Sequence, residues 1–216
     1  LQLDTHFPRI PGDVGSFDTF KCELEIIRVP NATVKQVVNA DPNQIDLDPF
    51  FDAINKATGD LITTSCGFLS PFQNELDEVC DVPFISSSLR QLEHLKNIYK
   101  PPELQIITFD AAKLGPTHLP IGCEAFNKSV CGLNSDAHLK SIIENNISHI
   151  DISKATADIC AVVRANKKKS TKGILLECTN LPPYKIDIRR ISDVPIYDIL
   201  TAIEKELPDS VHPYFL

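Results

Sequence analysis

Short apolar runs and longer amphipathic stretches alternate along the chain. Runs rich in aliphatic and β-branched residues predict strands at 1–3, 24–29, 61–64, 82–85, 104–109, 173–177 and 194–196. Apolar residues at helical spacing predict helices at 46–58, about 71–79, about 88–99, 152–166 and 197–207. Strands that alternate with helices through short connections are typical of a parallel sheet covered on both faces, so the pattern predicts an α/β fold.

The run at 61–64 leads to a cysteine, Cys66, and then to the start of a helix. Ser70, Pro71 and Gln73 provide an N-cap, a first-turn proline and a capping-box partner for that helix. A thiol beside the amide end of a helix can have a lowered pKa, because the helix dipole favours the thiolate. The other interpretation of a single cysteine is a small apolar residue of the core.

The segment around Cys66 recurs 112 residues later around Cys178. Without a gap, six of the eighteen positions from Cys66 to Pro83 are identical to those from Cys178 to Pro195, whereas average residue frequencies predict about one. The repeat predicts two related α/β halves, 1–99 and 100–216, with the C-terminal helix able to pack back on the first half. Doubly wound sheets bind ligands at the carboxyl ends of their strands, so we expect both cysteines to face one cleft.

Two thiols on opposite sides of one carbon atom can invert its configuration. One thiol, ionised, removes a proton while the other supplies a proton to the opposite face. The other five cysteines have no such counterpart and are interpreted as structural or incidental: Cys22, Cys80, Cys123, Cys131 and Cys160. The repeated pair therefore predicts proton transfer at a single carbon.

Composition narrows the classes of partner. A net charge of −8 and a pI near 5.2 argue against nucleic acid or an anionic membrane as the main partner. No apolar run approaches the roughly 18 residues that span a bilayer, and no signal segment is recognisable, so we expect a cytoplasmic protein. Neither a CxxC or Cys/His spacing nor a glycine-rich nucleotide loop occurs, so we expect no metal and no cofactor.

Three segments together resemble the aspartate/glutamate racemase superfamily, and the resemblance covers essentially the whole chain. They are the Cys66 segment at 63–68, the Cys178 segment at 177–184, and the opening loop at 3–15 with the pattern LDTxFPRxPGDxG, which is similar to one subgroup in particular. The resemblance implies two pseudosymmetric doubly wound halves, an active site in the cleft between them, cofactor-independent proton transfer by two cysteines, and a homodimer.

The same resemblance implies a set of substrate contacts. It places Asp4 and Thr5 near the substrate amine and the first cysteine, and Thr179 near the substrate carboxylate. Amino-acid racemases have Asn-Thr after the first cysteine, whereas this chain has Gly67 and Phe68. The further candidates for contact with substrate are polar or cationic: Arg9, Ser65, Ser86, Ser87 and Asn180, of which Arg9 could clamp a carboxylate.

The sequence thus predicts an isomerase: a cofactor-independent racemase or epimerase of a small carboxylated substrate, with Cys66 and Cys178 as acid and base. Within the same fold, the alternatives are maleate-isomerase-like or decarboxylase chemistry, in which one cysteine is a nucleophile. A third alternative is a binding protein that has kept the cleft and lost the chemistry, which the Gly67-Phe68 departure favours.

Overall fold

The computed structural model describes residues 1–216 and contains two parallel β-sheets flanked by helices. The smaller sheet pairs β1 (Ile62–Thr63) with β2 (Phe84–Ile85). The larger sheet has the strand order β4 (Val130–Gly132), β3 (Leu104–Thr108), β5 (Gly173–Leu176) and β6 (Ile196–Tyr197). Every neighbouring pair is parallel, which confirms the α/β class predicted from the sequence.

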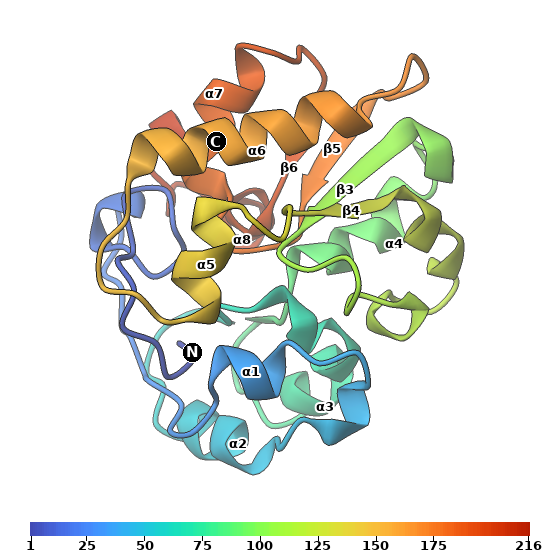
Figure 1. The fold of residues 1–216 in the computed structure, drawn as a ribbon. Coiled ribbons are helices and arrows are strands. Elements are labelled where there is room, and N and C mark those ends of the chain that lie inside the picture. Colours follow the sequence, from blue (N-terminus) through green and yellow to red (C-terminus); the bar gives the residue numbers. More distant parts are fainter.

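Eight α-helices surround the sheets. They are α1 (Val34–Val37), α2 (Asp48–Ile54), α3 (Gln73–Asp77), α4 (Leu92–Leu95), α5 (His138–Glu144), α6 (Ile152–Asn166), α7 (Lys185–Arg189) and α8 (Ile199–Glu206). Helices α1, α2 and α3 lie at one end of the molecule, and α6 and α7 lie at the other end beside the larger sheet (Figure 1). None of the helices is both long and apolar enough to cross a membrane.

The predicted elements differ from the observed ones mainly in the first half of the chain. The helix predicted at about 71–79 begins as a 3-10 helix at Gly67–Phe72 and continues as α3. The strand predicted at 24–29 contributes only one isolated bridge, between Arg28 and Gln2. That prediction is wrong because residues 22–26 are mostly exposed and have no neighbouring strand to pair with.

The two central strands of the larger sheet are buried on both faces. All residues of β3 and β5 are buried, as expected for parallel strands covered by helices on both sides. Helix α8 packs its buried face against Val14 and Ile85 in a second, smaller core cluster. A buried ion pair fixes this region: Lys185 Nζ lies 2.6 Å from Asp198 Oδ2, and Asp198 caps α8 by accepting a hydrogen bond from the Thr201 amide.

Candidate active site

Cys66 and Cys178 line one small cavity between the two sheets. Cys66 follows β1 and Cys178 follows β5, so both lie just beyond the carboxyl end of a strand. Each cysteine is 8% exposed. The cavity has a volume of about 20 Å³, which is room for about one water molecule. The structure thus brings the two repeated cysteines to one site, and a substrate can enter only if the lining moves.

Hydrogen bonds at the end of β1 hold Cys66 in place. The Cys66 amide donates to Thr64 Oγ1 over 3.3 Å, and the Thr64 hydroxyl lies 2.7 Å from the Ser86 carbonyl oxygen, to which it can donate. This hydroxyl therefore fastens the end of β1 to the residue that follows β2. The backbone of Cys66 is extended, and the 3-10 helix Gly67–Phe72 begins directly after it.

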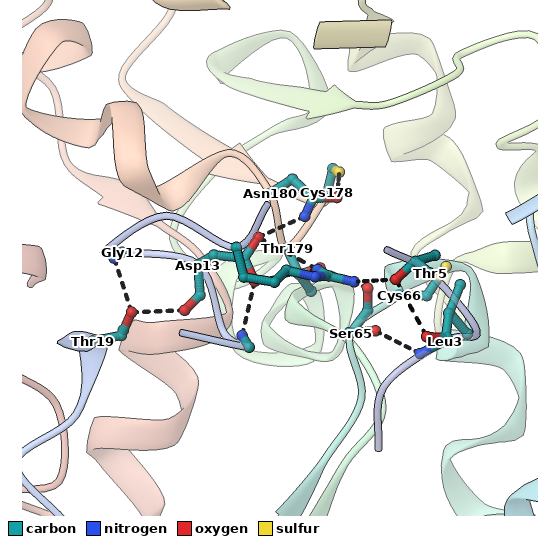
Figure 2. Close-up of polar contacts among 12 residues, drawn as sticks. Leu3, Thr5, Gly12, Asp13, Thr19, Ser65, Cys66, Cys178, Thr179 and Asn180 are labelled. Atoms are coloured by element: carbon teal, nitrogen blue, oxygen red, sulfur yellow. Dashed lines mark hydrogen bonds and ion pairs between the residues drawn. The ribbon is translucent and has the colours of Figure 1, made fainter. Parts of the chain in front are cut away.

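The turn after β5 joins Cys178 to the first half of the chain. Thr179 Oγ1 donates to the Ser65 carbonyl oxygen over 2.7 Å, which ties the two cysteine-bearing turns together. The Cys178 thiol lies 3.6 Å from Asn180 Oδ1 and donates to it. Figure 2 shows the two cysteine-bearing turns near each other, with Thr179 close to Ser65.

The opening loop completes the wall beside Cys178. Asp13 is 2% exposed, and its Oδ2 accepts a hydrogen bond from Asn180 Nδ2 over 2.6 Å (Figure 2). Gly12 has a φ of +100°, and a Cβ at this position would lie 2.7 Å from Pro183 Cα. A glycine is required here because of both the left-handed backbone and the close approach of Pro183. Sequence analysis did not single out Asp13, although it belongs to the PGDxG part of the opening loop.

Arg9 also lines the cavity, and its contacts leave the Nε atom without a partner. Arg9 Nη1 lies 3.2 Å from Asp13 Oδ1, and Nη2 donates to Thr5 Oγ1 over 3.1 Å. The guanidinium carbon lies 4.5 Å from the centre of the Phe7 ring. Arg9 Nε is buried and has no partner. The predicted carboxylate clamp therefore lies at the cavity with an unused N–H group.

Glu177, which sequence analysis missed, is a buried carboxyl group in the same lining. It is 1% exposed and directly precedes Cys178. Thr108 Oγ1 donates to Glu177 Oε2 over 2.6 Å, whereas Glu177 Oε1 has no partner. Burial raises the pKa of Glu177 to about 7, because the charged form loses its hydration. A charged residue at the end of the apolar run 173–177 was the signal that could have identified it.

Both cavity thiols favour the protonated form. Burial, and then the Glu177 carboxylate, raise the pKa of Cys66 to about 12, and the same two causes raise the pKa of Cys178 well above its usual range. The hydrogen bond of Cys66 with the Phe68 amide lowers the pKa, as predicted for a helix start, but the effect is smaller than that of burial. The expectation of a lowered pKa at Cys66 is therefore wrong.

Gly67 and Phe68, which replace the racemase Asn-Thr, have specific surroundings. A Cβ on Gly67 would lie 2.0 Å from Glu177 Oε1 and 2.7 Å from the Glu177 carbonyl oxygen, so no other residue fits beside Glu177. Phe68 packs edge-to-face on the buried ring of His118, with 5.0 Å between ring centres. An apolar wall and a carboxyl group thus occupy the place expected to bind a substrate carboxylate.

Three predicted contact residues lie outside the cavity lining. Asp4 pairs weakly with Arg28, whose Nη1 lies 3.9 Å from Asp4 Oδ1. Ser86 donates to Gln73 Oε1, and Ser87 accepts from the Leu89 amide as an N-cap. These hydrogen bonds are local structural contacts, which leaves their predicted roles in substrate binding without support from the geometry.

A larger cavity lies next to this site, and Ser65 lines both. The larger cavity has a volume of about 450 Å³, is lined by residues 22–27 and 57–65 among others, and contains neither Cys66 nor Cys178. No group of three or more His, Cys, Asp and Glu side chains is gathered closely enough to hold a metal ion.

Comparison with known proteins relates the chain to lyases. No family model matches it. It is 29% identical to the dimethylsulfoniopropionate lyase of Durusdinium sp. clade D, over 94% of this chain and 71% of that protein. It is 27% identical to dimethylsulfoniopropionate lyase 7 of Emiliania huxleyi (strain CCMP1516), over 94% of this chain and 63% of that protein. The chain spans 43% to 63% of the length of the four Emiliania huxleyi relatives.

Solved structures similar to this chain include racemases. An aspartate racemase homologue from Pyrococcus horikoshii OT3 has a TM-score of 0.42 and 15% identity, over 68% of this chain and 65% of that chain. Glutamate racemase isoform RacE1 from Bacillus anthracis has a TM-score of 0.44 and 15% identity, over 75% of this chain and 64% of that chain.

The relatives contradict the predicted isomerase activity. The proteins that align with 94% of this chain are named as lyases, so the expectation of a racemase or epimerase is wrong. A racemase returns a proton to the carbon that lost one, whereas an elimination expels a leaving group from the neighbouring carbon. Removing a proton from carbon is the first requirement of both reactions, so the cysteine pair alone could not distinguish them.

Proposed function

We propose that the chain is a lyase that eliminates dimethyl sulfide from dimethylsulfoniopropionate or a close analogue. The similarity to dimethylsulfoniopropionate lyases over 94% of the chain carries this proposal. The site supports it, because two buried thiols and a buried carboxyl group surround one cavity next to a guanidinium group. A small substrate that bears both a carboxylate and a cation is the chemical class that such a lining suits.

The atoms and electrons of the proposed elimination balance with a single base supplied by the protein. A base removes a proton from the carbon beside the one that bears sulfur. The electrons of that C–H bond form the new C=C bond of acrylate, and the C–S bond breaks with its electron pair on sulfur. Neutral dimethyl sulfide leaves, and the base keeps the proton until water accepts it. Cys66 or Cys178 would supply the base as a thiolate.

A cationic substrate would itself help to prepare this base. In the ligand-free protein, burial and Glu177 hold the pKa values of both thiols high. An opposite charge placed within a few ångströms favours the thiolate and therefore opposes both effects.

We also propose that the chain consists of the two halves predicted from the repeat, 1–99 and 100–216. The smaller sheet lies within 1–99 and the larger sheet within 100–216. The hydrogen bond from Thr179 to Ser65 crosses between these ranges at the site. We infer that the chain is a member of the aspartate/glutamate racemase superfamily with the long opening loop, that it acts as a homodimer, and that its chemistry is elimination.

The direct test is to incubate the 216-residue chain with dimethylsulfoniopropionate. We expect dimethyl sulfide and acrylate in equal amounts, measured by gas chromatography and proton NMR. We expect Cys66→Ala and Cys178→Ala each to lower kcat, by about 10²-fold or more for the thiol that acts as base.

Cys160→Ala is the matched control for these variants. Cys160 is also 8% exposed, but it lies on α6 outside the cavity, so the rate should be unchanged. Absence of dimethyl sulfide from the folded wild-type chain would refute the proposed function. Unchanged rates in both cavity variants would refute the role of the cysteines.

A further inference from the structure

Glu177 is a buried carboxyl group without a cationic partner. No Lys, Arg or His side chain forms an ion pair or hydrogen bond with it, and its carboxyl group is contacted by two uncharged donors, the Thr108 hydroxyl and the Phe109 amide. The two nearby basic side chains of the site region are already paired, Arg9 with Asp13 and Lys140 with Asp110. A buried carboxylate is normally retained only where a cation or several donors compensate for its lost hydration.

The free oxygen of Glu177 lies against the backbone beside the first cysteine. Glu177 Oε1 is inaccessible and has no partner, and a Cβ on Gly67 would lie 2.0 Å from it. Gly67 therefore leaves the space that the carboxyl group fills. Because Glu177 and Gly67 both line the cavity of the two cysteines, this carboxyl group can contact a molecule that enters.

Aromatic rings form much of the remaining wall. Phe7, Phe68 and Phe109 line the same cavity. Arg9 already lies over Phe7 at 4.5 Å, and Lys140 Nζ lies 5.6 Å from the centre of the Phe109 ring, so the faces of these rings are used to stabilise positive charge. Aromatic faces also attract organic cations whose charge is covered by methyl groups, because such cations are weakly hydrated.

We propose that Glu177, in the space left by Gly67, is the anionic subsite that binds the onium group of a zwitterionic substrate. The subsite takes a sulfonium or quaternary ammonium cation, while the unused Nε of Arg9 is available to the carboxylate at the other end of the same small molecule. This inference rests on the proposed function for the identity of the sulfonium. It deepens that proposal by assigning a residue that determines specificity.

Two probes of the same shape separate charge from size. The probe with a cationic group is 3-(trimethylammonio)propionate, whose amine is a poor leaving group, and its counterpart is 4,4-dimethylpentanoate, in which an uncharged carbon replaces the nitrogen. We expect calorimetric titration of the wild-type chain to give binding about tenfold or more tighter for the cation. In Glu177→Gln the ratio of the two dissociation constants should fall to about one, while binding of 4,4-dimethylpentanoate stays within about threefold.

Two further variants make the result specific to this carboxyl group. Glu177→Asp keeps the negative charge and should keep part of the preference for the cation. A preference that is kept in Glu177→Asp and lost in folded Glu177→Gln follows the charge and not a general loss of structure. Glu78→Gln removes an exposed acid beyond α3 and should leave the preference intact, which controls for net charge. Equal binding of both probes by the wild-type chain, or a preference that persists in folded Glu177→Gln, would overturn the inference.

The anionic subsite and the lyase activity can be contradicted independently, the first by the binding test and the second by the activity test. A chain that prefers the cation through Glu177 but releases no dimethyl sulfide would have the subsite and a different reaction. A chain that releases dimethyl sulfide equally well with Gln at position 177, and shows no preference between the probes, would be a lyase that binds its cation elsewhere.

Discussion

At the residue scale, the site is governed by three acidic groups whose ionisation is opposed by burial. Burial is the largest cause of the raised pKa at Glu177, Cys66 and Cys178. Ionised Glu177 opposes ionisation of both thiols, so a charge on one of these groups makes a charge on the others less favourable. A cation bound beside these groups favours their ionised forms at neutral pH.

Glu177 should make the protein less stable as the pH rises. Its pKa is raised from 4.5 to about 7 in the folded protein, so between these values the folded state binds more protons than the unfolded state. Stability therefore falls with rising pH in this window, by about 3 kcal/mol once the pH is above both values. We expect Glu177→Gln to remove this fall, measured as the difference in the urea unfolding free energy between about pH 5 and about pH 8.

The control for this prediction is Glu78→Gln, which changes an exposed side chain. It should leave the pH dependence of the unfolding free energy as it is in the wild-type chain. A wild-type and a Glu177→Gln protein with the same pH dependence would show that Glu177 ionises as easily when folded as when unfolded.

The sequence could identify the cysteine pair but not the residues that control it. Cys66 and Cys178 were found because a gapless repeat relates them, and such a repeat is a local pattern. Glu177 and Asp13 were missed because their importance comes from burial and from partners distant in sequence, Thr108 and Asn180 respectively. The lowered pKa expected at Cys66 was wrong because a helix start was weighed without the opposing burial.

At the scale of elements, three connections build the site: the opening loop, the turn after β1 and the turn after β5. The opening loop contacts the last of these at Gly12, whose backbone faces Pro183. Asp13, the next residue, then reaches Asn180. The position of Asp13, and through it that of Arg9, thus depends on how closely Gly12 approaches the turn.

Gly12→Ala should therefore destabilise the protein. The new Cβ would lie 2.7 Å from Pro183 Cα, and the φ of +100° is unfavourable for alanine. We expect a loss of about 1–3 kcal/mol of unfolding free energy in urea. Gly59→Ala is the matched control, because the nearest atom to its Cβ is 3.6 Å away, and it should change the unfolding free energy by less than about 0.5 kcal/mol. Equal effects of the two substitutions would contradict the close approach at Gly12.

Elements with a strong period could be predicted from the sequence, and elements defined by long-range contacts could not. The helix at 152–166 was predicted with the bounds of α6, because one face of it is apolar over four turns. The apolar run at 24–29 resembles a strand, but a strand needs a neighbour along its length, and only Arg28 has one. Such pairing is a property of the assembled fold.

At the scale of the whole molecule, the site is closed. The cavity of about 20 Å³ is far smaller than any carboxylate substrate with a sulfonium group. The hydrogen bonds from Thr179 to Ser65 and from Asn180 to Asp13 lie across it. Entry of a substrate must therefore widen the space between the turn after β5 and the elements of the first half.

A closed site should slow alkylation of the cavity thiols. All seven cysteines are free, and Cys22 is exposed. With iodoacetamide at about pH 8, we expect Cys66 and Cys178 to react roughly 10²-fold or more slowly than Cys22, because they are buried and their pKa values are raised. Peptide mass spectrometry over time measures the rates.

Unfolding in urea provides the control for this prediction, because it should bring all the cysteines to similar rates. Cys160, buried outside the cavity, should behave like the cavity pair in the folded protein. Labelling of Cys66 or Cys178 as fast as Cys22 in the folded protein would contradict a closed site.

The contact between Gly67 and Glu177 restricts which substitutions this site can accept. A chain that gains a side chain at Gly67 while it still has Glu177 must accommodate atoms 2.0 Å apart. A smaller residue at position 177 would remove the clash with the carboxylate oxygen but not the 2.7 Å approach of the backbone carbonyl oxygen, so a side chain at Gly67 also requires the backbone at position 177 to move. A library built to place a side chain at Gly67 should therefore vary both positions together.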